Sequence, residues 1–157
     1  QSNTVNGTPS KISLEGEHFL TVLADEDQSE IELANLALKK SNNAQVQEYA
    51  RTKILAADPA MEQEAKKIAE ESAAPPGFPT PSDKAEYYFL SKLAGKAFDR
   101  AYMDYEDAKQ REDLITVRHE AASAKNPELK KYAQKEVTPV QQAADSAQSI
   151  AKALGSS

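Results

Sequence analysis

Apolar residues recur every three to four positions along most of this chain, which is the spacing of amphipathic helices. No segment alternates apolar and polar residues with a period of two, so no β-strand is predicted. The spacing predicts helices over residues 15–40, 44–71, 84–93, 96–124 and 127–153. The four longest would each measure about 40 Å at a rise of about 1.5 Å per residue, which suits a helix bundle.

Polar or proline-rich segments separate these helices. Residues 1–14 are rich in Ser, Asn, Thr and Gly and are predicted to be a flexible tail, which leaves residues 15–154 as a single domain. Residues 73–81 contain four prolines and are expected to be stiff and extended, with Ser82 or Asp83 capping the next helix. Because proline removes a helical hydrogen bond, kinks are expected just before Pro59 and at Pro139.

An internal repeat suggests how the helices are paired. Residues 43–50 and 126–133 match position by position: each has an asparagine, an apolar residue three positions later, and Tyr-Ala after three more. Asparagine is a good helix N-cap, so each copy opens the second helix of a hairpin. Two hairpins joined by a long proline-rich crossover predict an all-α, ferritin-like four-helix bundle, with a short extra helix before the third.

Composition excludes several classes of function. The net charge is −6, and no basic patch of the kind that binds nucleic acid is present. The chain has no cysteine, and no apolar run approaches the ~18 residues of a transmembrane helix. The polar start at Gln1 lacks Met, so we expect a mature N-terminus from which a signal peptide has been removed.

Two glutamates are the most informative candidates for chemistry. Glu26 and Glu30 are four residues apart and lie on the apolar stripe of the first helix. A carboxylate on an apolar face must be paired, hydrogen-bonded or protonated. Three interpretations stay open: a buried Glu–Tyr hydrogen bond, a solvated stripe edge, or a ligand site. The ligand-site candidates are Glu26, Glu30, Tyr102 and Tyr105.

Metal-binding and catalytic patterns are weak. A di-iron site in a bundle needs two Glu-x-x-His pairs, and this chain has one, ending at His18. An alternative metal set would be His18, Glu30 and Asp58. His119 and Glu120 are adjacent in sequence and are expected to point in different directions on a helix. The charged run 106–113 is expected to be a solvated helix face, and no catalytic residue is predicted.

The order of these elements resembles the DUF4142 family of bacterial periplasmic or outer-membrane-associated proteins, over roughly residues 17–154. Members of that family typically carry histidines at positions that hold Pro59, Gln110 and Ala143 or Ala144 here, so a metal bound in that way is not expected. The residues that carry the resemblance are Phe19, Glu30, Leu33, Ala37, Asn43, Val46, Ala50, Gly95, Phe98, Asp99, Tyr102, Asn126, Pro127, Leu129, Ala133 and Pro139.

The sequence and the resemblance together predict a non-enzymatic protein of the bacterial envelope, without a cofactor. Its partner would be an envelope protein or a small molecule, and its location the periplasm or the outer membrane. Two alternatives stay open. One is a ferritin-like metal-binding or oxidase-type protein that uses helix carboxylates, and the other is a structural, self-associating bundle.

Overall fold

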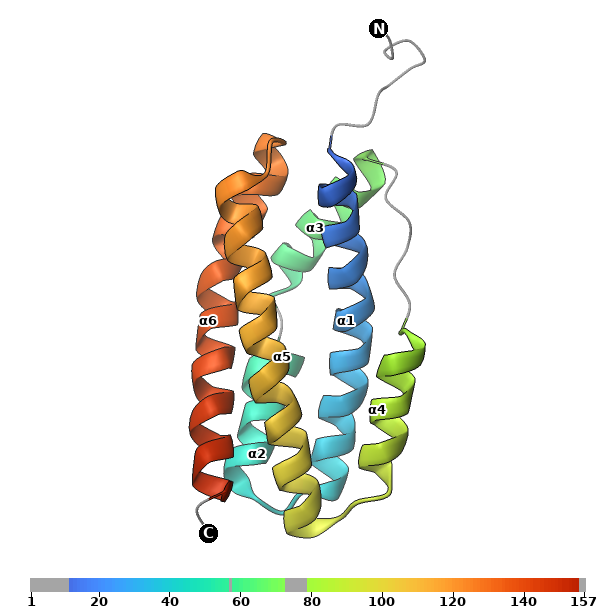
Figure 1. The fold of residues 1–157 in the computed structure, drawn as a ribbon, viewed down its shortest axis with the longest axis vertical. Coiled ribbons are helices and arrows are strands. Elements are labelled where there is room, and N and C mark those ends of the chain that lie inside the picture. The colour runs from blue at the N-terminus through green and yellow to red at the C-terminus, as the bar shows by residue number, and fades with distance from the viewer. Residues whose placement is uncertain (1–11, 57, 73–78, 156–157) are drawn as a thin grey trace, which may run out of the picture.

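The chain folds as a bundle of helices in the computed structural model, which describes residues 12–56, 58–72 and 79–155. The prediction of an all-α, ferritin-like bundle is confirmed, and the described residues contain no strand. α1, α5 and α6 run the length of the bundle, and α2 and α3 share the fourth position (Figure 1). The elements are α1 (Leu14–Lys40), α2 (Ala44–Tyr49), the π-helix η1 (Ala50–Leu55), α3 (Pro59–Glu71), α4 (Pro81–Ser91), α5 (Gly95–Ser123) and α6 (Pro127–Gly155).

The first helix begins within the segment that the sequence predicts to be a tail. The Ser13 side chain accepts a hydrogen bond from the Gly16 N–H and caps α1 at Leu14. Ile12 is buried in the same apolar cluster as Phe19 and Leu129. Residues 1–11 lie outside the described part of the chain.

The helix predicted over residues 44–71 is not a single helix with a kink. The expectation of a single helix over residues 44–71 is wrong, because α2 passes into the π-helix η1, which ends at Leu55, and α3 begins separately at Pro59. Pro59 takes the first position of a new helix, where its missing N–H is not needed. Asp58 caps this helix by accepting a hydrogen bond from the Ala60 N–H. The proline therefore starts a helix instead of bending one.

The connection to α4 ends in a capping box. Residues 73–78 of the expected extended crossover lie outside the described residues. The cap is Thr80 and not Ser82 or Asp83, because Thr80 Oγ1 accepts from the Asp83 N–H while Asp83 accepts from the Thr80 N–H. α4 is anchored at its other end by Lys40, whose Nζ donates to the carbonyls of Ser91 and Leu93 at 2.7 and 2.9 Å.

The second hairpin follows the sequence prediction closely. Gly95 has φ +58°, a left-handed conformation that glycine adopts without steric cost, and it opens α5. Asn126 accepts a hydrogen bond from the Leu129 N–H and Asn43 accepts one from the Val46 N–H, so the repeated caps are confirmed. α6 continues through Pro139 without ending.

The apolar core consists of two clusters with a polar layer between them. The upper cluster packs around Phe19, Leu20 and Leu129, and the lower one around Leu33, Phe98 and Met103. On α1, Glu30 lies between the two clusters, and on α5 Glu106 and Gln110 do so. The middle of the bundle is therefore where polar side chains meet inside the protein.

Candidate functional site

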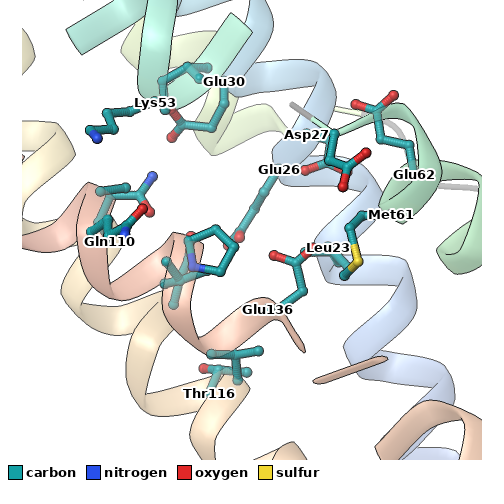
Figure 2. Close-up of a pocket in the computed structure, with 18 of the residues that line it drawn as sticks. Leu23, Glu26, Asp27, Glu30, Lys53, Met61, Glu62, Gln110, Thr116 and Glu136 are labelled. Atoms are coloured by element: carbon teal, nitrogen blue, oxygen red, sulfur yellow. The ribbon is translucent and has the colours of Figure 1, made fainter. Parts of the chain in front are cut away.

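A cavity of about 540 Å³ opens beside this polar layer (Figure 2). Its walls come from α1, α5, α6 and the broken second helix, which contributes Thr52, Lys53, Asp58 and Met61. The break in that helix makes the space, because a continuous helix would cover this part of α1. The volume is in the usual range for a small-molecule site, about 300–1,000 Å³. The acidic lining residues are Glu26, Asp27, Glu30, Asp58, Glu62, Glu112, Asp113 and Glu136.

A pair of buried carboxyl groups closes the inner wall. Glu30 is 8% exposed and Glu106 is fully buried. Tyr49 donates a hydrogen bond to Glu106 Oε1 at 2.7 Å, and the Gln110 amide donates a weaker one at 3.4 Å. Neither oxygen of Glu30 accepts a hydrogen bond from a donor among the described residues. Glu30 lines the cavity, so its carboxyl group faces any ligand that binds there.

Burial disfavours the charged form of both members of this pair. Burial, and then repulsion from Glu106, raise the pKa of Glu30 well above its ordinary value. Burial also raises the pKa of Glu106, although hydrogen bonds from Glu30, Tyr49 and Gln110 oppose the rise. A hydrogen bond between the two carboxyls forms only when one of them is protonated.

Other carboxyls in the cavity are perturbed in the same direction. Burial, together with repulsion from Glu26, raises the pKa of Asp113 to about 9. Burial within the cavity walls, and then repulsion from Glu136 and Glu62, raise the pKa of Asp27 to about 7. Burial is the largest cause of both shifts, and the neighbouring carboxylates add to it.

Basic groups near the cavity are few. Lys109 Nζ contacts Glu26 Oε2 at 2.8 Å, so Glu26 has its own counter-ion. Among the lining residues that the structure describes, Lys53 is the basic residue, and it is exposed. Apolar side chains, including Phe19, Leu23 and Val140, form the rest of the wall. The cavity is therefore apolar in part and acidic in charge.

The structure separates the predicted ligand residues into two groups. Glu26 and Glu30 line the cavity, whereas Tyr102 and Tyr105 do not. Tyr102 is fully buried and stacks on Phe98 with ring centroids 5.7 Å apart. Its hydroxyl has no hydrogen-bond partner among the residues that the structure describes. Tyr105 is half-buried. The expected type of Glu–Tyr hydrogen bond exists, but it joins Tyr49 to Glu106.

The alternative metal set is not assembled. His18 is exposed and lies twelve residues before Glu30 on α1, about 18 Å along the helix axis. Asp58 is exposed and caps α3. Among the described residues, three ligand atoms of His, Asp or Glu converge within 4.8 Å at another place, formed by Glu15, His119 and Glu120.

Sequence reasoning missed the buried residues of α5. The prediction that residues 106–113 form a solvated face is wrong, because Glu106 is fully buried, Gln110 is 6% exposed and Asp113 lines the cavity. A signal was present: Phe98, Tyr102, Glu106, Gln110 and Leu114 follow one another at intervals of four, which is one face of a helix. The pattern was not recognised because most residues between these positions in the run 106–113 are charged.

The protonated carboxyls make stability depend on pH. The free energy of unfolding is expected to fall by about 1–2 kcal/mol between pH 5 and pH 9. This is less than the full 1.36 kcal/mol per pKa unit, because Asp27 is exposed to solvent and Asp113 is only half-buried. A raised carboxyl pKa stabilises the folded state fully below the unfolded value near 4, and this contribution is lost as pH rises through 7 and 9.

Urea unfolding at pH 5, 7 and 9 measures this dependence. The double variant Asp27→Asn, Asp113→Asn removes both titrating groups and is expected to show a flatter profile than the unmodified chain. If the stability of the unmodified chain stayed constant or rose from pH 5 to pH 9, the raised pKa values of Asp27 and Asp113 would be contradicted.

The fold and cavity define a class of protein: an all-α bundle that encloses an acidic, partly apolar cavity at mid-length. The chain belongs to the DUF4142 family, described as a domain of unknown function, whose match covers residues 2–150. That description indicates no enzymatic family. No curated protein matches the sequence.

A solved structure shares the fold. It is a crystal structure of a DUF305 fragment from Deinococcus radiodurans, with a TM-score of 0.76 and 16% sequence identity, over 96% of this chain and 100% of that one. At this identity the likeness concerns the fold. No helix within the described ranges combines the length and the apolar character needed to cross a membrane.

Proposed function

We propose that this chain is a non-enzymatic binding protein of the bacterial envelope whose mid-bundle cavity holds a small organic cation. The observation that carries the proposal is the Glu30 carboxyl: it is buried, lines the cavity and receives no hydrogen bond from the described residues. The charged form of a buried carboxyl group is costly, and a cationic ligand in the cavity would stabilise it.

The lining favours an organic cation over a bare metal ion. The cavity carboxylates come from four helices but do not bring three ligand atoms within 4.8 Å of one another. A metal centre needs such convergence, with bonds of about 2.0–2.2 Å for zinc. An ammonium group on an apolar body instead matches separated carboxylates on apolar walls. The ferritin-like metal or oxidase function therefore has no support from the cavity geometry.

Calorimetric titration with benzyltrimethylammonium tests this proposal, with benzyl alcohol as a neutral comparison. The cation is expected to bind at least tenfold more tightly than the alcohol. Its affinity should rise from pH 6 to pH 9, because the cation displaces protons from carboxyls such as Asp27 and Asp113. Proton release is measured by repeating the titration in buffers of different ionisation enthalpy.

Two variants of α5 make the test specific. Asp113→Asn is expected to weaken binding of the cation about tenfold, because Asp113 lines the cavity. Asp104→Asn removes the same charge from an exposed position on the same helix outside the lining, and is expected to change affinity less than twofold. Equal binding of cation and alcohol, or equal effects of the two variants, would exclude the proposed ligand class.

The envelope location is supported by the resemblance of the chain to periplasmic and outer-membrane-associated proteins. Fractionation of bacteria that express the complete gene tests it. The protein is expected in the periplasmic or outer-membrane fraction, and its recovery with cytoplasmic markers would contradict this part of the proposal.

A further inference from the structure

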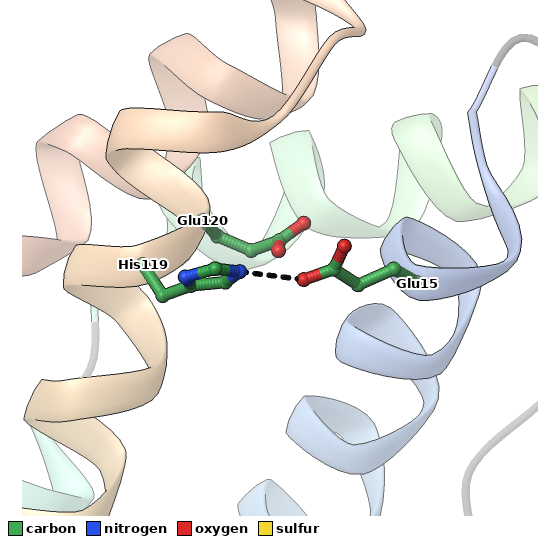
Figure 3. Close-up of side chains that lie close together, drawn as sticks. All are labelled: Glu15, His119 and Glu120. Carbon is green, nitrogen blue, oxygen red and sulfur yellow. Dashed lines mark hydrogen bonds and ion pairs between the residues drawn. The ribbon is translucent and has the colours of Figure 1, made fainter.

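Three potential metal ligands meet between the start of α1 and the end of α5, away from the cavity. Glu15 comes from the first turn of α1, and His119 and Glu120 come from the last turns of α5 (Figure 3). One ligand atom from each lies within 4.8 Å of the other two. His119 Nε2 contacts Glu15 Oε2 at 2.7 Å. Glu15 is eleven residues, or about 16 Å of helix, from Glu26 in the cavity wall.

The sequence argument against His119 and Glu120 acting together is overturned by this geometry. Adjacent residues on a helix do leave the axis about 100° apart. Both side chains are long, however, and Figure 3 shows both turning toward Glu15 on the facing helix. The three side chains meet only because Glu15, about a hundred positions earlier in the sequence, lies opposite His119 and Glu120 in the fold.

Glu120 is the buried member of the group. The residue is only 3% exposed. Within the described part of the chain, no lysine or arginine forms an ion pair with it, and its charged neighbours are Glu15 and His119. A cation placed between two neighbouring carboxylates stabilises both of them, most strongly where one is buried.

We propose that Glu15, His119 and Glu120 bind one divalent transition-metal ion of the zinc type, which joins α1 to α5 at this end of the bundle. Two carboxylates and one imidazole are ligands that Zn²⁺ accepts, with bonds of about 2.0–2.2 Å. Three protein ligands leave a fourth tetrahedral position for water.

Small side-chain movements would complete the site. Tetrahedral bonds of that length place ligand atoms roughly 3.4 Å apart. Glu15 and His119 are closer than this because they now share a hydrogen bond, and both are 61% exposed and can rotate. Glu120 is held by its burial and supplies the fixed ligand. The bound ion would replace the hydrogen bond by a stronger link between the two helices.

Zinc titration of the tag-free full chain tests the proposal by calorimetry and thermal unfolding. One ion per chain is expected, and a hundredfold excess over the dissociation constant should raise the unfolding midpoint by about 5–10 °C. Co²⁺ replaces Zn²⁺ as a spectroscopic probe, and the intense visible absorption of a tetrahedral site is expected.

The chain contains two histidines, which gives a matched control. His119→Gln and Glu120→Gln are each expected to weaken zinc binding at least tenfold. His18→Gln changes an exposed histidine of α1 outside the group and is expected to leave it unchanged. His119 is exposed, so its variant should fold even if Glu120→Gln does not. Loss of binding in His18→Gln, or retention in His119→Gln, would overturn the assignment.

Discussion

Replacement of Glu30 by glutamine is expected to raise the free energy of unfolding by about 1–3 kcal/mol at pH 8 and to weaken cation binding at least tenfold. The unfolded chain carries Glu30 as a carboxylate above pH 5. In the folded chain, burial and then repulsion from Glu106 raise the pKa of Glu30 well above its ordinary value, so the charged form is disfavoured there. Each pH unit between the two pKa values costs the folded state about 1.36 kcal/mol for a fully buried group.

Glutamine has the shape of the protonated glutamate but does not titrate. The gain in stability should therefore be close to zero at pH 5 and grow as the pH rises. Binding changes in the opposite direction, because glutamine cannot offer a negative charge to a cation in the cavity. A single substitution that stabilises the protein and removes its ligand is the behaviour expected of a site adapted to function instead of stability.

Urea unfolding at pH 5 and pH 8 and titration with benzyltrimethylammonium measure both effects. Glu32→Gln on the exposed face of α1 is the matched control, and it should alter neither quantity appreciably. Destabilisation of Glu30→Gln by more than about 1 kcal/mol at pH 8 would show that Glu30 is a structural residue. Unchanged affinity for the cation would show that its carboxylate does not face the ligand.

Replacement of Phe98 by alanine is expected to lower the free energy of unfolding by about 3–5 kcal/mol. Phe98 is fully buried in the lower core, and its ring stacks on Tyr102 with an interplanar angle of 11°. Tyr102 in turn packs edge-on against Tyr49, the donor to Glu106. Loss of the ring removes buried apolar surface and leaves a cavity under the carboxyl pair.

Thermal unfolding measures this effect, with an expected fall in midpoint of roughly 6–20 °C for a chain of this size. Phe89→Ala is the matched control because Phe89 is 53% exposed on α4, and its midpoint should shift by no more than a few degrees. Comparable losses in the two variants would mean that the lower core does not depend on the stacked aromatic pair.

Much of the fold was predictable because helices are specified locally. Asn43 and Asn126 cap helices through their own backbone neighbours, and Pro127 suits the first helical turn, so these boundaries follow from short stretches of sequence. The same kind of local chemistry was misjudged at Pro59. A proline inside an apolar stripe is compatible with a kink or with a new helix, and Asp58 as a cap favours the latter.

The candidate site was predictable only in part. Glu26 and Glu30 were identifiable because a charge on an apolar stripe is unusual. Glu106 was missed because it stands in a run of charged residues, and its hydrogen-bond donor, Tyr49, lies fifty-seven residues earlier in the sequence. The group of Glu15, His119 and Glu120 likewise joins residues about a hundred positions apart.

The sequence by itself determined the all-α class, the positions of most helices and their pairing into hairpins, because periodicity and capping act over a few residues. Only the tertiary structure decided where carboxylates meet. Their burial and mutual repulsion depend on which helix faces cross in space, and the break at Asp58 opens the cavity that Glu30 lines. The sequence shows which residues carry ionisable groups, but the packing of the helices decides how deeply each group is buried and which charges lie beside it.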